Sequence, residues 1–258
     1  MTVDLRGERD LGEIVGYAYR LYFANFIPLF LIALVTAPLQ MLAAVVLRQV
    51  EGEGAATALV WAFQIPTFLV GLIASAALVY AVHAITEGAS AEPMRALDAA
   101  FERMGSVLST GLLTLALVIL ALISWPIMLI RWLFQERAMR GHLAPVAIPF
   151  AYGPYLAVRW QFVSQFVMID DRARWPALDS SAGIVEGKWW RVFGIMVVVT
   201  VIQLGPVALA TLSAAAPPLV EATITSLVAA LVLPFAVIAQ TLLYYDLKAR
   251  KHADLGPA

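Results

Sequence analysis

One arginine stands alone in the apolar part of this chain, with two glutamines close behind it. Arg159 interrupts the stretch 143–169, which is otherwise uncharged, and Gln161 and Gln165 follow it one turn apart. If this stretch is one straight helix across a bilayer, the guanidinium lies near mid-membrane, at a cost of roughly 2.5–3.5 kcal/mol. Arginines in such places normally face a cavity, a partner or backbone carbonyls. The three side chains are therefore a candidate polar or substrate site, of the kind that broken helices form in transporters.

A second interpretation keeps this charge out of the membrane interior. Arg140–Val158 is then the membrane span, Arg159 and Trp160 mark the headgroup boundary, and 161–169 lies along the interface. Arginine beside tryptophan is an ordinary interfacial anchor. A third interpretation makes Arg159 part of a structural polar network. The sequence leaves all three open.

No other residues have the pattern of a catalytic or metal site. His83, His142 and His252 are isolated, and the chain has no cysteine. No Asp or Glu lies inside an apolar run, so the usual intramembrane proton relay is missing. Serines and threonines occur without a histidine or lysine base in a recognisable pattern. We therefore expect no catalytic residue, no metal, no cofactor and no enzymatic activity.

Six long apolar runs must position these residues. A helix needs about 20 apolar residues to cross a hydrocarbon core roughly 30 Å thick. Hydrophobic residues make up 62% of the chain and charged ones 14%, whereas soluble proteins carry about 25% charged residues. The sequence predicts an all-α, polytopic membrane bundle of six transmembrane helices in a single domain, 1–258. The runs are Phe26–Leu47, Ala55–Ile85, Val107–Ile130, Leu143–Ile169, Val192–Leu212 and Ala222–Tyr245.

A short amphipathic helix precedes each odd-numbered run and gives the chain a repeated plan. The first helix opens with Asp10 and Glu13, which resemble a capping box; the third opens at Trp175-Pro176, and Gly187 marks its end. We expect the three helices to form an interfacial collar at headgroup level, although ordinary connectors are the alternative. The repeat units are about 11–86, 91–170 and 175–246. The apolar faces comprise Leu11, Ile14, Val15, Ala18, Leu21 and Tyr22; Met94, Leu97, Phe101 and Met104; and Leu178, Ala182, Val185 and Trp189.

The basic residues predict the orientation in the membrane. Of the 17 Lys and Arg residues, 12 lie in the N-terminal segment, the second and fourth loops and the tail, and four lie on the opposite side. Because cytoplasmic loops carry the excess of basic residues, we expect both termini in the cytoplasm, with 247–258 as a cytoplasmic tail. The basic segment Arg131–Arg140 is the exception to this pattern. Trp189, Trp190 and Arg191, ahead of the fifth run, are predicted interfacial anchors.

Three stretches together resemble a known family. They are Leu11–Phe26 (LGEIVGYAYRLYFANF), Gly187–Gly194 (GKWWRVFG) and Leu243–Lys248 (LYYDLK). The chain resembles the glycerophosphoryl diester phosphodiesterase membrane-domain family over essentially its whole length. The resemblance implies a six-helix membrane domain, which in the family either precedes a soluble phosphodiesterase barrel or stands alone. Because the chain ends soon after the sixth run, we expect no catalytic barrel and no phosphodiesterase activity.

The chain departs from that family just ahead of Trp189. There the family usually has a helix rich in arginine, whereas this chain reads Asp179-Ser180-Ser181-Ala182-Gly183. This departure weakens the case that this helix binds anionic lipid.

Two functions from different classes remain. The net charge of −1 and the lack of long basic runs argue against a nucleic-acid partner. We expect a multi-pass protein of the cell membrane, specifically a bacterial inner membrane, that is non-enzymatic and acts through protein partners or the lipids of the bilayer; a homo-oligomer is also open. The alternative is a small transporter or channel with a polar pocket around Arg159. A continuous polar cavity would favour transport, and an exposed lateral groove beside an apolar core would favour the first role.

Overall fold

The structure is a computed structural model that describes residues 10–47, 53–134 and 153–254. The regular elements in these ranges are helical, which confirms the predicted all-α class. Within the same ranges, five helical segments are long and apolar enough to cross a membrane. The fourth predicted run lies partly outside the described residues, so the count of six stays a prediction. The five segments are Phe26–Val46, Thr57–Thr86, Met104–Ala121, Trp189–Thr211 and Leu219–Lys251.

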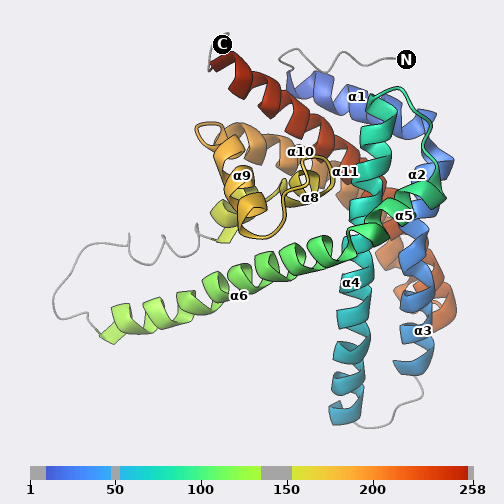
Figure 1. Ribbon diagram of the computed structural model, residues 1–258. Helices are drawn as coiled ribbons and strands as arrows, with labels where there is room; N and C mark the ends of the chain where they lie inside the picture. Colours follow the sequence, from blue (N-terminus) through green and yellow to red (C-terminus); the bar gives the residue numbers. More distant parts are fainter. Residues whose placement is uncertain (1–9, 48–52, 135–152, 255–258) are drawn as a thin grey trace.

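Two long helices, α4 (Glu53–Thr86) and α11 (Pro218–Asp254), form the centre of the bundle. They pack against each other, and α2 (Phe26–Ala33) and α3 (Ala37–Leu47) pack on both (Figure 1). The 3-10 turn η1 (Leu34–Thr36) joins α2 to α3. The first predicted span is therefore a helix with one tightened turn in its middle.

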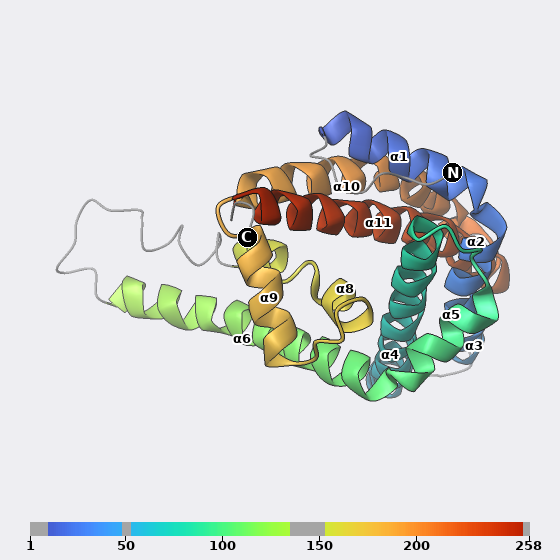
Figure 2. The ribbon, with the colours of Figure 1, turned by 45° about the horizontal axis from the view of Figure 1, so that its top comes forward.

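The other two long helices differ in how much of the bundle they contact. Helix α10 (Trp189–Thr211) packs along α11 and is joined to it through the 3-10 turn η2 (Leu212–Ala215). Helix α6 (Met104–Phe134) approaches α4 at Gly111, where a Cβ atom would lie 2.6 Å from the end of the Leu72 side chain. Helix α6 also contacts α8 and α9, and its far end extends away from the rest of the bundle (Figures 1 and 2).

Each of the three predicted short helices is present. They are α1 (Leu11–Ala24), α5 (Pro93–Glu102) and α9 (Trp175–Val185). The capping box of α1 is confirmed, with the Asp10 amide donating to a Glu13 carboxylate oxygen at 3.0 Å. Helices α1 and α9 contact α11, whereas α5 lies on the other side of the bundle against α4 (Figure 2).

Packing explains the amphipathic sequence of these helices. Most residues of the predicted apolar faces of α1 and α9 are buried, as Ala18 and Leu178 illustrate at 0% and 2% exposure, although Leu11 at the start of α1 is 40% exposed. Helix α5 divides its apolar residues between two sides. Ala96 contacts the bundle, whereas Met94 and Phe101 are 71% and 53% exposed. An exposed apolar side next to polar residues is what a helix at a membrane interface presents to lipid.

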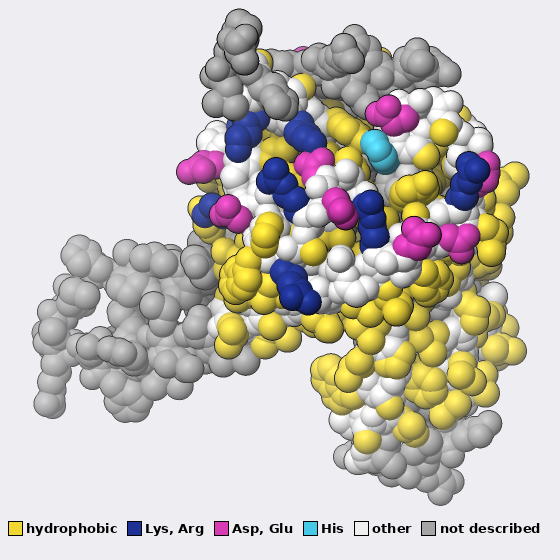
Figure 3. Space-filling model, viewed as in Figure 1, with side chains coloured by type: hydrophobic (Ala, Val, Ile, Leu, Met, Phe, Trp, Pro, Cys, Tyr) yellow, Lys and Arg dark blue, Asp and Glu magenta, His cyan; other side chains and the backbone are white. Residues whose placement is uncertain are grey.

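Charged side chains gather at one end of the bundle, above the apolar surface of α3 and of the lower part of α4 (Figure 3). Helix α1 and the last turns of α11 lie at this same end (Figure 1). The segregation follows from the cost of placing charge in hydrocarbon. It agrees with the sequence pattern of basic residues, while the side of the membrane that this end faces stays a prediction.

A buried carboxylate fixes this charged end. The Asp246 side chain on α11 is 0% exposed, and its oxygens lie 3.1 Å from Arg191 and 3.0 Å from Arg250. A second carboxylate, Asp170, accepts hydrogen bonds from Lys248 at 2.7 Å and from the Tyr244 hydroxyl at 2.8 Å. These contacts tie the start of α10 and the segment after residue 168 to the same two turns of α11.

Of the three stretches that carry the family resemblance, the third belongs to α11 and the first two contact this helix. Arg191 of the second stretch pairs with Asp246 of the third. Tyr22 of the first stretch donates its hydroxyl to the Leu231 carbonyl at 3.0 Å, and burial raises the pKa of this phenol above its ordinary value. The similar residues thus form interhelix contacts.

We expect Asp246→Asn to lower the free energy of unfolding by about 3 kcal/mol. This is the lower end of the range for breaking a buried pair, since both arginines keep some contact with solvent. Thermal unfolding of the purified protein in detergent measures the loss. Asp98→Asn, on the exposed side of α5, is the matched control and should melt like the parent. Equal melting of all three proteins would contradict a structural role for Asp246.

Candidate functional site

The helix that carries Arg159 ends at this residue. Residues 153–159 are helical, 160–162 form a turn, and α8 (Val163–Met168) follows. The hypothesis of one straight helix from Leu143 to Ile169 is therefore wrong for its described part, and 143–152 lie outside the described residues. The mid-membrane position of Arg159 depended on that straight helix.

One side-chain hydroxyl group pairs with the backbone groups that are left free where this helix ends. Ser181 of α9 is fully buried; its Oγ donates to the Arg159 carbonyl at 2.8 Å and accepts from the Phe162 amide at 3.2 Å. A hydroxyl can do both, because it carries one donor and two acceptor lone pairs. The backbone groups released by the break are thus satisfied away from water.

The other end of α8 is also held by a side chain from elsewhere in the chain. Arg103, between α5 and α6, donates to the Met168 carbonyl at 2.7 Å. Val163, Phe166 and Met168 are buried against α4, α6 and α9. Helix α8 is therefore a separate short helix enclosed by other helices of the bundle.

The Arg159 side chain lies at the surface of the charged end. Its guanidinium donates to the Tyr155 hydroxyl at 3.1 Å and sits 5.5 Å from the centre of the Tyr155 ring. Within the described part of the chain, Arg159 forms no ion pair. The Arg159 carbonyl therefore contacts Ser181, whereas its side chain contacts Tyr155 and remains partly exposed.

The two glutamines are in different environments. Gln161 lies in the turn and is partly exposed. Gln165 is fully buried in α8, and among the described residues neither its amide oxygen nor its nitrogen has a hydrogen-bond partner. Arg159 lines the cavity described next, whereas Gln161 and Gln165 do not. The structure therefore does not assemble the three predicted residues into one site.

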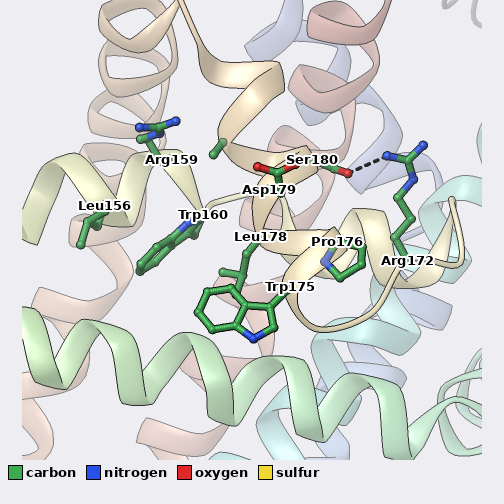
Figure 4. A pocket seen from close by; sticks show the side chains of 10 residues that line it. Leu156, Arg159, Trp160, Arg172, Trp175, Pro176, Leu178, Asp179 and Ser180 are labelled. Atoms are coloured by element: carbon green, nitrogen blue, oxygen red, sulfur yellow. Dashed lines mark hydrogen bonds between the residues drawn. The ribbon is translucent and has the colours of Figure 1, made fainter.

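An open cavity of about 700 Å³ lies between the end of the 153–159 helix and α9. Figure 4 shows charged side chains along one side of it, with Asp179 between Arg159 and Arg172, and apolar side chains below them. Arg172 donates to the Ser180 hydroxyl at 2.7 Å. The full lining is Leu156, Arg159, Trp160, Arg172, Trp175, Pro176, Leu178, Asp179, Ser180 and Ala182. We call this cavity the α9 groove.

The arginines of the α9 groove come from outside α9. Arg159 precedes the break, and Arg172 belongs to the loop that follows α8. In this loop the Arg174 amide donates to Thr110 on α6 at 2.7 Å, which helps to fix the path that brings Arg172 back to α9. Sequence reasoning judged the charge of α9 from its own residues and so missed the groove.

The predicted anchors have three different roles. Trp190 is 78% exposed, as an interfacial anchor must be. Trp189 donates to the Tyr155 carbonyl at 3.3 Å and stacks on Phe193. Arg191 is bound to Asp246, a pairing that the anchor prediction did not include. Trp189 thus supports the helix that carries Arg159.

The described part of the chain has no group of side chains arranged for chemical catalysis. Within it, no three His, Asp or Glu residues are grouped as a metal site would require. His83 contacts the Tyr245 hydroxyl through a ring nitrogen. The expectation of no enzymatic activity remains a prediction.

Comparison of the chain with protein-family models, curated proteins and solved structures gives no match. The resemblance to the membrane-domain family therefore stays a prediction as well.

We expect Ser181→Ala to lower the free energy of unfolding by about 1–3 kcal/mol, because it leaves a buried amide and a buried carbonyl unpaired. Ser180→Ala, one residue earlier and partly exposed, should change it by no more than about 0.5 kcal/mol. Arg159→Leu should also fold normally, since the Arg159 contact with Ser181 is through the backbone. Thermal unfolding of the three variants measures the difference. A loss with Arg159→Leu as large as with Ser181→Ala would show that the side chain is structural.

Proposed function

We propose that this chain is a non-enzymatic, multi-pass membrane protein that acts through lipids or protein partners bound at the α9 groove. The observation that carries the proposal is the position of this groove. It lies against α9, whose Gly183 carbonyl accepts from Lys251 in the last turns of α11, and it combines charged and apolar side chains. A molecule that is itself part apolar and part charged fits such a lining.

The apolar core beside the groove supports the same role. Ile14, Leu29 and Leu78 are fully buried in one continuous cluster that joins α1, α2 and α4. Well-packed helices present fixed surfaces to partners, because protein interiors resist deformation. In this proposal the bundle serves as a scaffold that holds the groove at headgroup level.

The cellular setting belongs to the proposal too. We place the chain in the cell membrane, specifically a bacterial inner membrane, with both termini in the cytoplasm, since basic residues are concentrated on the side of the termini. Membership of the glycerophosphoryl diester phosphodiesterase membrane-domain family is proposed on the three similar stretches, with the contact of Arg191 and Asp246 in support.

Purification of the protein with its surrounding native lipid tests this role. We expect specific lipids or a specific protein to co-purify with the parent and to be depleted with Arg159→Glu, because the substitution reverses a charge of the groove. Arg95→Glu, which alters an exposed arginine of α5 outside the groove, should retain them. Identification of the bound molecules by mass spectrometry is the measurement. Identical bound material from all three proteins would contradict the proposal.

A second candidate function, a small transporter or channel, is favoured by one observation. Gln165 is a buried polar side chain that has no hydrogen-bond partner among the described residues. It lies in a short helix that follows an interruption between two helices. Such features occur along substrate pathways. Gln165→Leu should leave the melting temperature equal or higher, since an unpaired polar group is replaced by an apolar one of similar size. If the stable variant loses solute flux that the reconstituted parent supports, transport is the better description.

A further inference from the structure

The charged rim of the α9 groove carries both signs of charge. Arg159 and Arg172 lie on either side of Asp179, whose carboxylate is exposed (Figure 4). Within the described residues, Asp179 forms no ion pair. A ligand that matches this rim needs a negative group for an arginine and a positive group for the aspartate.

The remaining lining of the groove is apolar and aromatic. Leu156 and Leu178 are buried, and Trp175 is 62% exposed. Figure 4 shows Trp160, Leu178 and Trp175 on the side of the groove next to α6. Tryptophan favours the level of the membrane interface, where its ring contacts both headgroups and acyl chains. The cavity volume of about 700 Å³ is within the usual range for small-molecule sites.

We propose that the α9 groove binds a glycerophospholipid whose headgroup carries both a phosphate and a primary ammonium, as phosphatidylethanolamine does. Arg159 donates to the phosphate, and Asp179 accepts from the ammonium. Leu156, Leu178 and the tryptophans contact the glycerol and the upper acyl chains. The proposal rests on the proposed function and names the lipid class that the groove selects.

Charge complementarity separates this headgroup from the other common ones. A purely anionic headgroup offers no N–H donor to Asp179 and brings a like charge close to its carboxylate. A choline headgroup has a quaternary nitrogen, which has no N–H to donate to the carboxylate. Arg159 and Arg172 each direct one donor to a hydroxyl group, that of Tyr155 and that of Ser180, so both keep further donors for a phosphate. The rim therefore favours a phosphate and a primary ammonium on one molecule.

Native mass spectrometry of the full chain in detergent tests the selection. The probes are phosphatidylethanolamine, phosphatidylglycerol and phosphatidylcholine with identical acyl chains. We expect the ethanolamine lipid to bind best. Arg159→Gln and Asp179→Asn should each weaken its binding roughly tenfold, as loss of a hydrogen bond between charged groups implies. Arg95→Gln and Asp98→Asn, on exposed positions of α5, are the matched controls and should bind like the parent.

Two further variants guard against an effect of misfolding. Arg159→Lys and Asp179→Glu keep the charges and should keep the lipid preference. Equal binding of the three lipids by the parent, or undiminished ethanolamine-lipid binding by both Arg159→Gln and Asp179→Asn, would overturn the lipid proposal. A protein that co-purifies through the groove without lipid selection would overturn it too, while leaving the proposed function intact.

Discussion

The arrangement around Arg159 depends on a single hydroxyl group, which pairs with backbone groups left free where a helix is interrupted. Buried backbone donors and acceptors must be paired, so a helix can end inside a protein only where another group replaces the lost hydrogen bonds. Ser181 does this for the break between Arg159 and Phe162. Because these backbone groups are paired, α8 can lie inside the bundle while the Arg159 side chain lies at its surface. The α9 groove is the space between the helix that ends at Arg159 and the helix that supplies Ser181.

Charge pairs then hold the surrounding elements in register. Asp246 on α11 is buried between Arg191 and Arg250, and Asp170 is held by Lys248. A buried carboxylate is stable only while its partners stay in place, so these pairs fix α10 and the loop after α8 relative to α11. That loop carries Arg172, and its position sets one side of the groove. Fold stability and groove geometry therefore rely on the same end of the bundle.

Much of the architecture could be predicted from local patterns. The start of α1 follows from Asp10 and Glu13, and the end of the third short helix is marked by Gly187, whose φ of +73° suits glycine. Apolar length predicted the long helices that the structure describes. These signals lie within one element, where spacing alone determines which residues meet.

The groove and the break could not be predicted in this way. Ser181 contacts Arg159 across 22 positions of sequence, and only the folded chain brings them together. Arg172 reaches α9 because a loop returns to it, so the composition of α9 gave no sign of nearby arginine. Gln165 stood near Arg159 in sequence, yet the turn at 160–162 directs one residue inward and the other outward. Contacts between distant segments, rather than composition, decide what this site can bind.

The most direct test of the central claim is the depth of residue 159 in the membrane. Because the chain has no cysteine, Arg159→Cys, Trp190→Cys and Val201→Cys can each be labelled with a membrane-impermeant maleimide in sealed vesicles of known orientation. Trp190 is exposed at the charged end, and Val201 is 60% exposed midway along α10. We expect Arg159→Cys to react as fast as Trp190→Cys and from the same side, with Val201→Cys protected. Protection of Arg159→Cys equal to that of Val201→Cys would place the residue in the membrane interior and contradict the surface groove.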